Sequence, residues 1–195
     1  MTAAVPAGTA RRPRSRLRAR VALAAFSTLG LAALAWASLV SPLPRLTYNP
    51  SESMAVGWYR VDPPGNRADL RHGSLRVGSI LLARMPAEAA ALAAQRSYLP
   101  SDVPLLKRVA AVAPQQVCMI GRRVHIDGVP AAAALAADRM GRPLSVWQEC
   151  RRLVPGELLL PSTSDPASFD SRYFGPIDAS AVIGVAHQLW PEIGR

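Results

Sequence analysis

The sequence predicts a mainly β protein with antiparallel strands and one or two short helices, preceded by a single N-terminal transmembrane helix. Residues 21–40 form an apolar run without a charged side chain. Beyond it, short stretches of β-forming residues alternate with turn residues, and the chain holds 18 prolines and 13 glycines. A chain of 195 residues is long enough for one globular domain with an appendage. Short strands separated by turn residues favour an antiparallel β domain.

The N-terminal region is expected to anchor the protein in the inner (cytoplasmic) membrane. Residues 1–20 contain six arginines among prolines and small residues, which is typical of a solvated arm. Residues 21–40, as a helix, would span about 30 Å, the thickness of the hydrocarbon core. Because basic residues favour the cytoplasmic side, we expect a cytoplasmic arm at 1–20, a transmembrane helix at 21–40 and a periplasmic domain at 42–195. The alternative is a cleaved secretory signal, since the Ala-Trp-Ala sequence at 35–37 has the form of a cleavage site.

The net charge of +10 is unevenly distributed along the chain. Residues 1–45 hold seven arginines and no acidic residue, whereas residues 46–195 hold 16 basic and 13 acidic side chains. The basic excess therefore belongs to a tail beside an apolar segment. A nucleic-acid-binding domain usually carries a broad basic face, so we expect no nucleic acid among the partners.

Three elements are expected in the first half of the domain. Residues 75–85 are rich in β-forming side chains and predict a strand. Residues 86–98 begin with proline, carry an acid in the first turn and are rich in alanine, which predicts a helix. Residues 103–112 predict a second strand, with Lys107 inside it.

The second half of the domain is expected to contain further short strands. Residues 117–126 cross Gly121 and end at an Asp-Gly pair, which indicates a hairpin. Residues 131–137 are interpreted as a short helix or loop. Residues 157–160 and 181–190 are expected to form strands.

A serine and a lysine are the most informative residues for function. Ser53 lies in the stretch NPSESMAVGW at 49–58, close behind the apolar run. Lys107 is the only lysine in a chain that carries 22 arginines. Arginine cannot give up its proton in a protein, whereas lysine can. A single retained lysine therefore suggests a general base that activates a serine nucleophile.

The neighbours of Lys107 suit a lysine that is neutral near pH 7. Leu105 and Val109 lie on the same face of the predicted strand. Burial among apolar groups can lower a lysine pKa by about three, enough to bring it into the range of 7–8. The alternative is a surface lysine whose aliphatic stem packs on the sheet.

The histidines offer little support for a Ser-His-Asp triad. His72, His125 and His187 have no recognisable catalytic context, and no serine lies in a G-x-S-x-G motif. Because a triad is defined by geometry, spacing alone does not exclude one. Structural roles are favoured for His125 and His187.

The two cysteines, Cys118 and Cys150, are not spaced as a metal or redox motif. In an oxidising compartment two cysteines most simply form one disulfide. Two separate buried thiols are the alternative.

Three motifs in order resemble the boxes of type I signal peptidases. Residues 50–54 (PSESM) are similar to the P-S-x-S-M box, and residues 107–109 (KRV) to the K-R-V/A box. Residues 168–175 (SFDSRYFG) are similar to the S-x-D-S-R-x-x-G box. The compact size and the wording around these boxes most resemble the TraF-type peptidases of conjugative transfer systems. One difference is Ala55, which stands where many members have proline, so we expect a looser turn after the nucleophile.

The resemblance implies a role for each matching residue. Ser53 would be the nucleophile and Lys107 the general base. The backbone N–H of Ser53 and the hydroxyl of Ser51 would hold the oxyanion, and Ser168 would orient the lysine amine. Supporting roles would fall to Met54, packed beside the nucleophile, and to Asp170 and Arg172, which would form a structural ion pair; an aspartate has also been proposed as a third catalytic member in TraF-type enzymes.

The implied function is a membrane-anchored serine endopeptidase with a signal-peptidase-like β domain and no cofactor or metal. Its substrate would be an exported precursor with small residues before the cleavage site, such as a pilin precursor, and conjugation or pilus assembly proteins are possible partners. A substrate held in the membrane favours a retained anchor over a cleaved signal. The acyl group could pass to water or to an amine, which would ligate a peptide. The rivals are a housekeeping signal peptidase and a catalytically silent, membrane-tethered assembly module.

Overall fold

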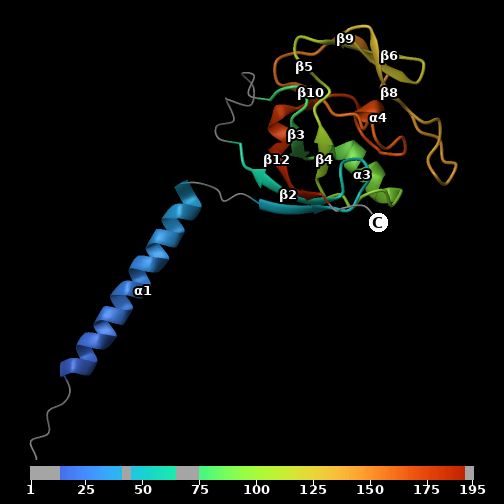
Figure 1. Ribbon diagram of the computed structural model, residues 1–195. Coiled ribbons are helices and arrows are strands. Elements are labelled where there is room, and N and C mark those ends of the chain that lie inside the picture. Colours follow the sequence, from blue (N-terminus) through green and yellow to red (C-terminus); the bar gives the residue numbers. More distant parts are fainter. Residues whose placement is uncertain (1–13, 41–44, 65–74, 192–195) are drawn as a thin grey trace, which may run out of the picture. The chain divides into compact units, whose positions relative to one another are not determined.

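The chain is organised in two compact units, residues 1–43 and 44–195. The computed structural model describes residues 14–40, 45–64 and 75–191. His72 therefore lies outside the described residues. The first unit contains one helix, α1 (Arg14–Val40), and the second contains all of the described strands (Figure 1).

Helix α1 begins earlier than the apolar run. It starts at Arg14 rather than at residue 21, so residues 14–20 of the expected arm are helical. Arginine is a good helix former and easily extends an apolar helix. The segment Leu17–Trp36 is long and apolar enough to cross a membrane, and its side chains are exposed. Length and composition alone do not distinguish a retained anchor from a signal sequence.

The second unit is built around a five-stranded antiparallel sheet. Its strands are, in spatial order, β1 (Arg45–Asn49), β2 (Gly57–Asp62), β12 (Val182–Pro191), β3 (Ile80–Ala83) and β4 (Leu105–Arg108). The long C-terminal strand β12 therefore joins the hairpin of β1 and β2 to the hairpin of β3 and β4. Figure 1 shows α3 (Ala87–Gln95) at the same end of this unit as β2.

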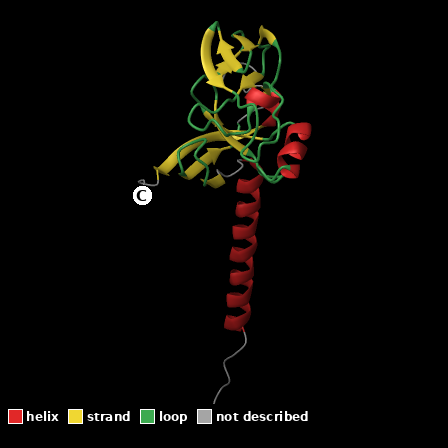
Figure 2. Cartoon of the chain, turned by 90° about the vertical axis from the view of Figure 1, so that its right-hand side faces the viewer, coloured by secondary structure: helices red, strands yellow, loops and turns green. Residues whose placement is uncertain are grey.

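Two smaller antiparallel sheets complete the unit. One has the order β11 (Ile177–Asp178), β10 (Glu157–Leu159) and β5 (Ala111–Val112). The other has the order β8 (Val129–Ala133), β7 (Arg123–Ile126), β6 (Gln116–Ile120) and β9 (Cys150–Arg152). Figure 1 shows this four-stranded sheet at the opposite end of the unit from β2, and in Figure 2 the short helices α3 and α4 (Ser171–Phe174) lie beside the strands. The predicted fold class, mainly antiparallel β with few helices after an apolar N-terminal helix, is confirmed.

Several predicted elements are found with changed boundaries. The helix expected at 86–98 is α3, with Pro86 at its N-cap. The strand expected at 75–85 shortens to β3, because the chain turns at Gly78, whose φ of 92° suits glycine. The strands expected at 157–160 and 181–190 are β10 and β12.

The strand expected at 103–112 is divided between two sheets. The Val109 N–H donates to Ser79 beside β3, whereas the next N–H, that of Ala110, donates to Leu159 in β10. The chain thus leaves the five-stranded sheet after β4 and joins the three-stranded sheet as β5. Lys107 stays inside β4, as predicted.

The interpretation of residues 131–137 as a helix or loop was wrong for the first half of that segment. Residues 131–133 belong to β8, which pairs with β7 through the turn at Asp127 and Gly128. The hairpin expected at 117–126 is β6 and β7, which turn at Gly121. Alanine has a low β propensity, but pairing with a neighbouring strand overrides it.

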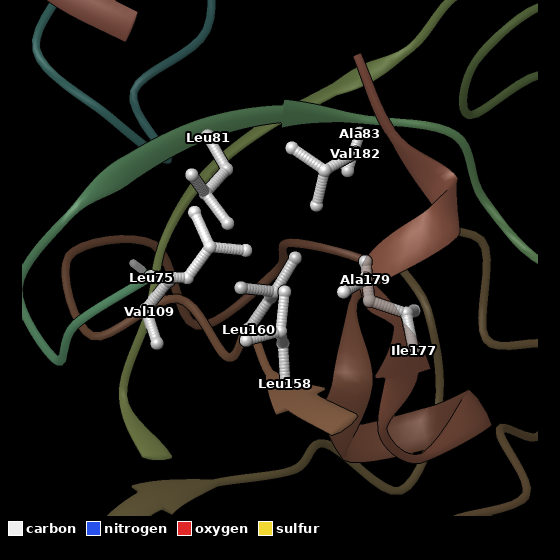
Figure 3. Close-up of a cluster of buried hydrophobic side chains, with 9 residues drawn as sticks. All are labelled: Leu75, Leu81, Ala83, Val109, Leu158, Leu160, Ile177, Ala179 and Val182. Atoms are coloured by element: carbon white, nitrogen blue, oxygen red, sulfur yellow. The ribbon is translucent and has the colours of Figure 1, made fainter. Parts of the chain in front are cut away.

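One apolar core lies between the five-stranded and three-stranded sheets. Figure 3 shows side chains from both sheets and from η1 (Ala179–Ala181) meeting there: Leu75, Leu81, Ala83, Val109, Leu158, Leu160, Ile177, Ala179 and Val182. On the other side of β3 and β4 a second cluster contains Met54, Tyr59, Val61, Leu82, Leu106 and Ala186. Strand β3 therefore contributes apolar side chains to both clusters, and Leu106 of β4 belongs to the second.

Candidate active site

The loop that carries Ser53 is closed by two neighbouring strands. Asn49, the last residue of β1, pairs with Gly57, the first residue of β2, so residues 50–56 form a closed excursion from the sheet. Met54 packs into the apolar cluster of β2, β3 and β4. This packing holds the adjacent Ser53 against the sheet, with 7% of its surface exposed.

Strand β4 brings Lys107 to the same place. Its neighbour across the sheet is Leu81 of β3, and Lys107 itself is only 4% exposed. The Lys107 Nζ atom lies 2.5 Å from the Ser53 Oγ atom. Two residues 54 positions apart in the chain are thus joined by a buried hydrogen bond.

Burial lowers the pKa of Lys107 to about 8. Removal of the ammonium from water is the largest cause, and the nearby Arg172 guanidinium lowers the pKa further. The carboxylates of Asp170 and Asp165 act in the opposite direction and raise it. At pH 7 about a tenth of the molecules then carry a neutral amine, which is the form that can accept a proton.

The hydroxyl of Ser51 lies on the other side of Ser53. The two Oγ atoms are 3.0 Å apart, and the Ser51 hydroxyl donates to Asn49 Oδ1 at 2.8 Å. The Asn49 side-chain amide donates in turn to the carbonyl oxygens of Ser51, Met54 and Ala55, at 2.9, 3.2 and 3.1 Å. Asn49 is thereby bonded to the loop at both ends of its amide.

The turn after Ser53 is held by hydrogen bonds despite the alanine at position 55. The Ala55 carbonyl accepts from the hydroxyl of the buried Tyr59 at 2.7 Å as well as from Asn49. Burial raises the pKa of Tyr59, so this hydroxyl keeps its proton. These two hydrogen bonds, which the sequence did not predict, hold the turn that was expected to be looser.

Asp170 and Arg172 form a buried, bidentate ion pair. The Arg172 Nε and Nη2 atoms lie 2.8 and 2.7 Å from the two carboxylate oxygens, and both side chains are almost completely buried. Asp170 also caps α4 by accepting from the Arg172 backbone N–H. Arg172 donates further to the carbonyl oxygens of Ala133, Asp165, Pro166 and Ser168. The pair therefore organises the whole segment before α4.

This ion pair is connected through two serines to residues 50–56, the nucleophile loop, named for the role predicted for Ser53. Asp170 accepts from the Ser162 backbone N–H at 2.9 Å. The Ser162 and Ser164 hydroxyls both donate to the Ser53 carbonyl, at 3.4 and 3.1 Å, and that of Ser164 also reaches the Glu52 carbonyl. The backbone of Ser53 is thus held from behind by the segment at 162–164.

Ser168 contacts this network through its backbone and not through its hydroxyl. Its carbonyl accepts from Arg172 at 2.7 Å and its N–H donates to Asp165. Within the described residues, the amine of Lys107 hydrogen-bonds to Ser53 and not to Ser168. The structure therefore brings Ser51, Ser53 and Lys107 together. Ser168 contacts Arg172 and Asp165 instead of the lysine amine.

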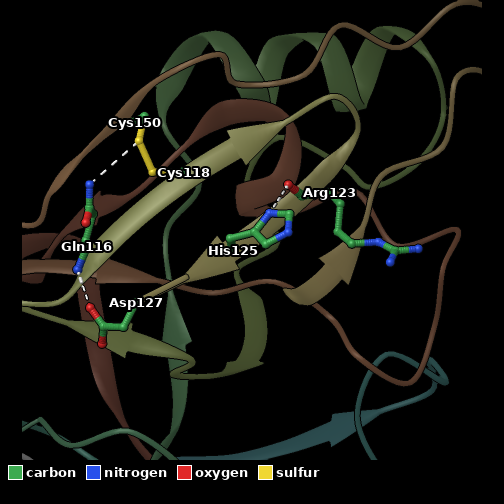
Figure 4. Close-up of a disulfide and its surroundings, with 6 residues drawn as sticks. All are labelled: Gln116, Cys118, Arg123, His125, Asp127 and Cys150. Atoms are coloured by element: carbon green, nitrogen blue, oxygen red, sulfur yellow. Dashed lines mark hydrogen bonds between the residues drawn. A yellow bond between two sulfur atoms is a disulfide. The ribbon is translucent and has the colours of Figure 1, made fainter. Parts of the chain in front are cut away.

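His125, His187 and the two cysteines lie outside this arrangement. His187 is exposed beside Asp62, and His125 contacts the Arg123 carbonyl on β7. Cys118 on β6 and Cys150 on β9 form a disulfide between residues directly opposite each other in the four-stranded sheet (Figure 4).

Four residues that hold the nucleophile loop were not predicted from the sequence: Asn49, Tyr59, Ser162 and Ser164. Asn49 gave a usable signal, because asparagine before a proline-serine pair commonly accepts from the backbone two residues on. The two serines gave none, since their partner lies more than 100 residues away in the chain.

Comparison with known proteins places these observations in a family. Residues 18–190 match the family described as signal peptidase, peptidase S26. A probable conjugal transfer protein TraF from Sinorhizobium fredii is 31% identical over 155 residues, which cover 74% of this chain and 76% of that protein. A conjugal transfer protein TraF from Agrobacterium tumefaciens is 32% identical over 155 residues, covering 75% and 81%. A plasmid transfer protein TraF from Escherichia coli is 37% identical over 92 residues, covering 45% and 52%.

A solved structure was also compared with the chain. The crystal structure of a signal peptidase I from Enterococcus faecalis is 18% identical and has a TM-score of 0.33. It covers 56% of this chain and 94% of its own length.

Proposed function

Because the chain belongs to the signal peptidase family, peptidase S26, we propose that it is a membrane-anchored serine endopeptidase with a Ser53–Lys107 dyad. The observation that carries this proposal is the buried 2.5 Å contact between Lys107 Nζ and Ser53 Oγ. A lysine held in an apolar strand and in contact with a hydroxyl has the reach and the pKa that a general base needs.

The proposed reaction has two steps, both served by the lysine. Ser53 Oγ attacks the scissile carbonyl carbon while its proton passes to Lys107 Nζ, which then protonates the leaving amine. The peptide bond breaks and an acyl ester forms on Ser53. Lys107, neutral again, takes a proton from a water molecule that attacks the ester. It returns this proton to Ser53 Oγ as the ester bond breaks, which releases the new carboxyl group and restores the free enzyme. If the attacking group is an amine, the product is a new peptide bond.

The oxyanion of each tetrahedral intermediate needs preorganised donors. We assign this role to the backbone N–H of Ser53 and to the hydroxyl of Ser51. The Ser51 hydroxyl has only one proton, which is donated to Asn49 in the resting enzyme. Ser51 therefore serves as the second donor once the substrate oxygen replaces Asn49 as its acceptor. Ser168, Asp170 and Arg172 act in this proposal by shaping the segment behind the dyad.

The substrate we propose is an exported precursor protein of a conjugative transfer system, such as a pilin precursor. The names of the relatives from Sinorhizobium and Agrobacterium, conjugal transfer proteins, support this choice over a housekeeping role. Helix α1 would anchor the enzyme in the inner membrane with its N-terminus in the cytoplasm, because the arginines precede the apolar segment. The β domain would then face the periplasm.

Exchange of Lys107 for arginine is the direct test of the dyad. Lys107→Arg keeps the positive charge but removes the ability to deprotonate, so turnover of an alanine-ended precursor peptide should fall at least about 100-fold. Ser53→Ala should be equally inactive. The matched control is Arg108→Lys, the reverse exchange on the exposed side of the same strand, which should retain activity. Turnover of Lys107→Arg at the wild-type rate would rule out the dyad, and a wild-type protein with no activity on any precursor would favour a silent assembly module.

A further inference from the structure

Asn49 occupies a position from which it can influence the dyad without touching it. It ends β1 and is 6% exposed. Its amide nitrogen faces three carbonyl oxygens of the nucleophile loop, all of which only accept hydrogen bonds. A flipped amide would place its oxygen against those three oxygens. The orientation of Asn49 is therefore fixed, with Oδ1 directed at Ser51.

This orientation determines where the protons of the two serines lie. Asn49 Oδ1 accepts from the Ser51 hydroxyl at 2.8 Å and from the Ser51 N–H at 3.2 Å. With its only proton on Asn49, Ser51 must accept in its 3.0 Å contact with Ser53. While the lysine is charged, the donors therefore run in one direction, from Lys107 to Ser53, to Ser51 and to Asn49.

The neutral lysine can act as a base only when its lone pair faces Ser53, and this form requires the opposite arrangement at Ser53. The Ser53 proton must then turn toward Nζ, which leaves lone pairs of Ser51 and Ser53 facing each other unless Ser51 withdraws its proton from Asn49. The acceptor strength of Asn49 thus favours the charged lysine and opposes the neutral one. A stronger acceptor at position 49 should hold the lysine proton more tightly.

We propose that Asn49 is a positioning residue that sets the proton affinity of Lys107 through the Ser51 and Ser53 hydroxyls. The proposal rests on the Ser53–Lys107 dyad proposed above and extends it by two side chains. Other charged groups around the lysine are Asp165, Asp170 and Arg172, with Glu52 exposed on the nucleophile loop. None of these is altered in the variants below, so their contribution stays constant.

The chain allows a direct measurement, because Lys107 is its only lysine. Incorporation of lysine labelled with ¹³C at Cε gives one side-chain signal in the full-length protein in detergent micelles. Titration of this signal reports the lysine pKa even in variants without activity. The same spectra show whether each variant is folded.

Asn49→Asp places a carboxylate oxygen, a stronger acceptor, at the end of the hydroxyl chain, so the pKa of Lys107 should rise by about 1 in the folded variant. The second carboxylate oxygen faces the three loop carbonyls that the amide nitrogen contacted, so the spectra of this variant must first show a native fold. In the background of Ser51→Ala the same exchange should raise it by less than half as much, because the connecting hydroxyl is absent. The acidic limb of the kcat/KM profile should move to higher pH in Asn49→Asp. Tyr59→Phe is the matched control, since it removes a hydrogen bond to the same loop but not one in the hydroxyl chain, and it should leave the lysine pKa unchanged.

Ser51→Ala alone provides a second test that leaves the amide bonds of Asn49 intact. Without Ser51 Oγ, the Ser53 proton has the lysine as its remaining partner, and the lysine pKa should fall. An equal rise for Asn49→Asp in both backgrounds, or an unchanged pKa in both Asn49→Asp and Ser51→Ala, would overturn the proposal while leaving the dyad intact. A wild-type lysine pKa near its ordinary value of about 10.4 would instead contradict the proposed function itself.

Discussion

Lys107 places an ammonium in a site that favours its neutral form, and this has a consequence for stability. With a folded pKa of about 8 against about 10.4 in the unfolded chain, burial of the charged amine costs about 3 kcal/mol at pH 7. Between these two pKa values the unfolded chain binds more protons than the folded one. Stability of the wild type should therefore rise with pH across this window.

Lys107→Met keeps the length and apolar stem of the side chain and removes the charge. We expect this variant to be inactive but more stable at pH 7, with a gain in Tm of about 2–4 °C for each kcal/mol recovered. The difference in Tm from the wild type should shrink as pH is raised from 8 toward 10. A Tm below that of the wild type at pH 7 would show that the charged amine is well solvated in the folded protein.

Some residues of the candidate site could not be predicted from the sequence. Ser53 and Lys107 stand out in the sequence because one lies in a recognisable box and the other is a lone lysine among arginines. Asn49 acquires its contacts only when β1 and β2 close the loop between them, and neither strand was predicted. The sequence therefore predicts the two residues of the proposed dyad but not the hydrogen bonds around them.

Among the structural elements, the segment from Ser162 to α4 connects the buried Asp170–Arg172 ion pair to Ser53. Asp170 pairs with Arg172 and also holds Ser162, whose hydroxyl contacts the Ser53 carbonyl. At the end of α4, Gly175 has a φ of 81°, and a Cβ there would lie 2.6 Å from the Trp147 ring. Only glycine fits at that position, which explains the last residue of the third box.

Asp170→Asn tests the element by leaving Arg172 buried without its anionic partner. Loss of one partner of a buried pair typically costs about 3–5 kcal/mol, so Tm should fall markedly. The pKa of Lys107 should also fall, because the Asp170 charge raises it. Asp62→Asn, which removes the exposed partner of Arg60, is the control and should cost less than about 1 kcal/mol. Equal Tm values for the two variants would contradict the structural role of the buried pair.

The disulfide belongs to a sheet whose role is separable from the chemistry. Cys118 and Cys150 are 32 residues apart, and reduction of such a loop is expected to cost about 3–4 kcal/mol. Dithiothreitol should therefore lower Tm, yet leave turnover unchanged well below the new Tm, because β6 and β9 carry no residue of the dyad. A double variant with Cys118→Ala and Cys150→Ala should not respond to the reductant. Loss of turnover on reduction at low temperature would link this sheet to the site.

Prediction of elements was most accurate where local signals and pairing agree. Helix α3 follows from the proline and acid at its start. The expected strand at 103–112 was divided because the chain changes sheets between Val109 and Ala110, a tertiary event without a local signal. Residues 131–133 form a strand despite their alanines, since β7 supplies the partner.

The whole molecule joins two units that differ in composition and in charge. Residues 1–43 hold the apolar helix and most of the excess positive charge, whereas residues 44–195 form the β domain. If α1 is a retained anchor, the full-length protein should stay in the membrane pellet after carbonate extraction. N-terminal sequencing of the isolated protein should then begin at Met1 or Thr2. A mature N-terminus after residue 37 would instead identify a cleaved signal.

The lone lysine of this chain is proposed to be a buried base with a pKa near neutral, in contact with Ser53. Titration of the single ¹³C-lysine signal in the wild-type protein tests it most directly. We expect a midpoint near pH 8, matched by the rise of kcat/KM with pH. A midpoint near the ordinary value of about 10.4, with the lysine charged throughout the active range, would contradict it.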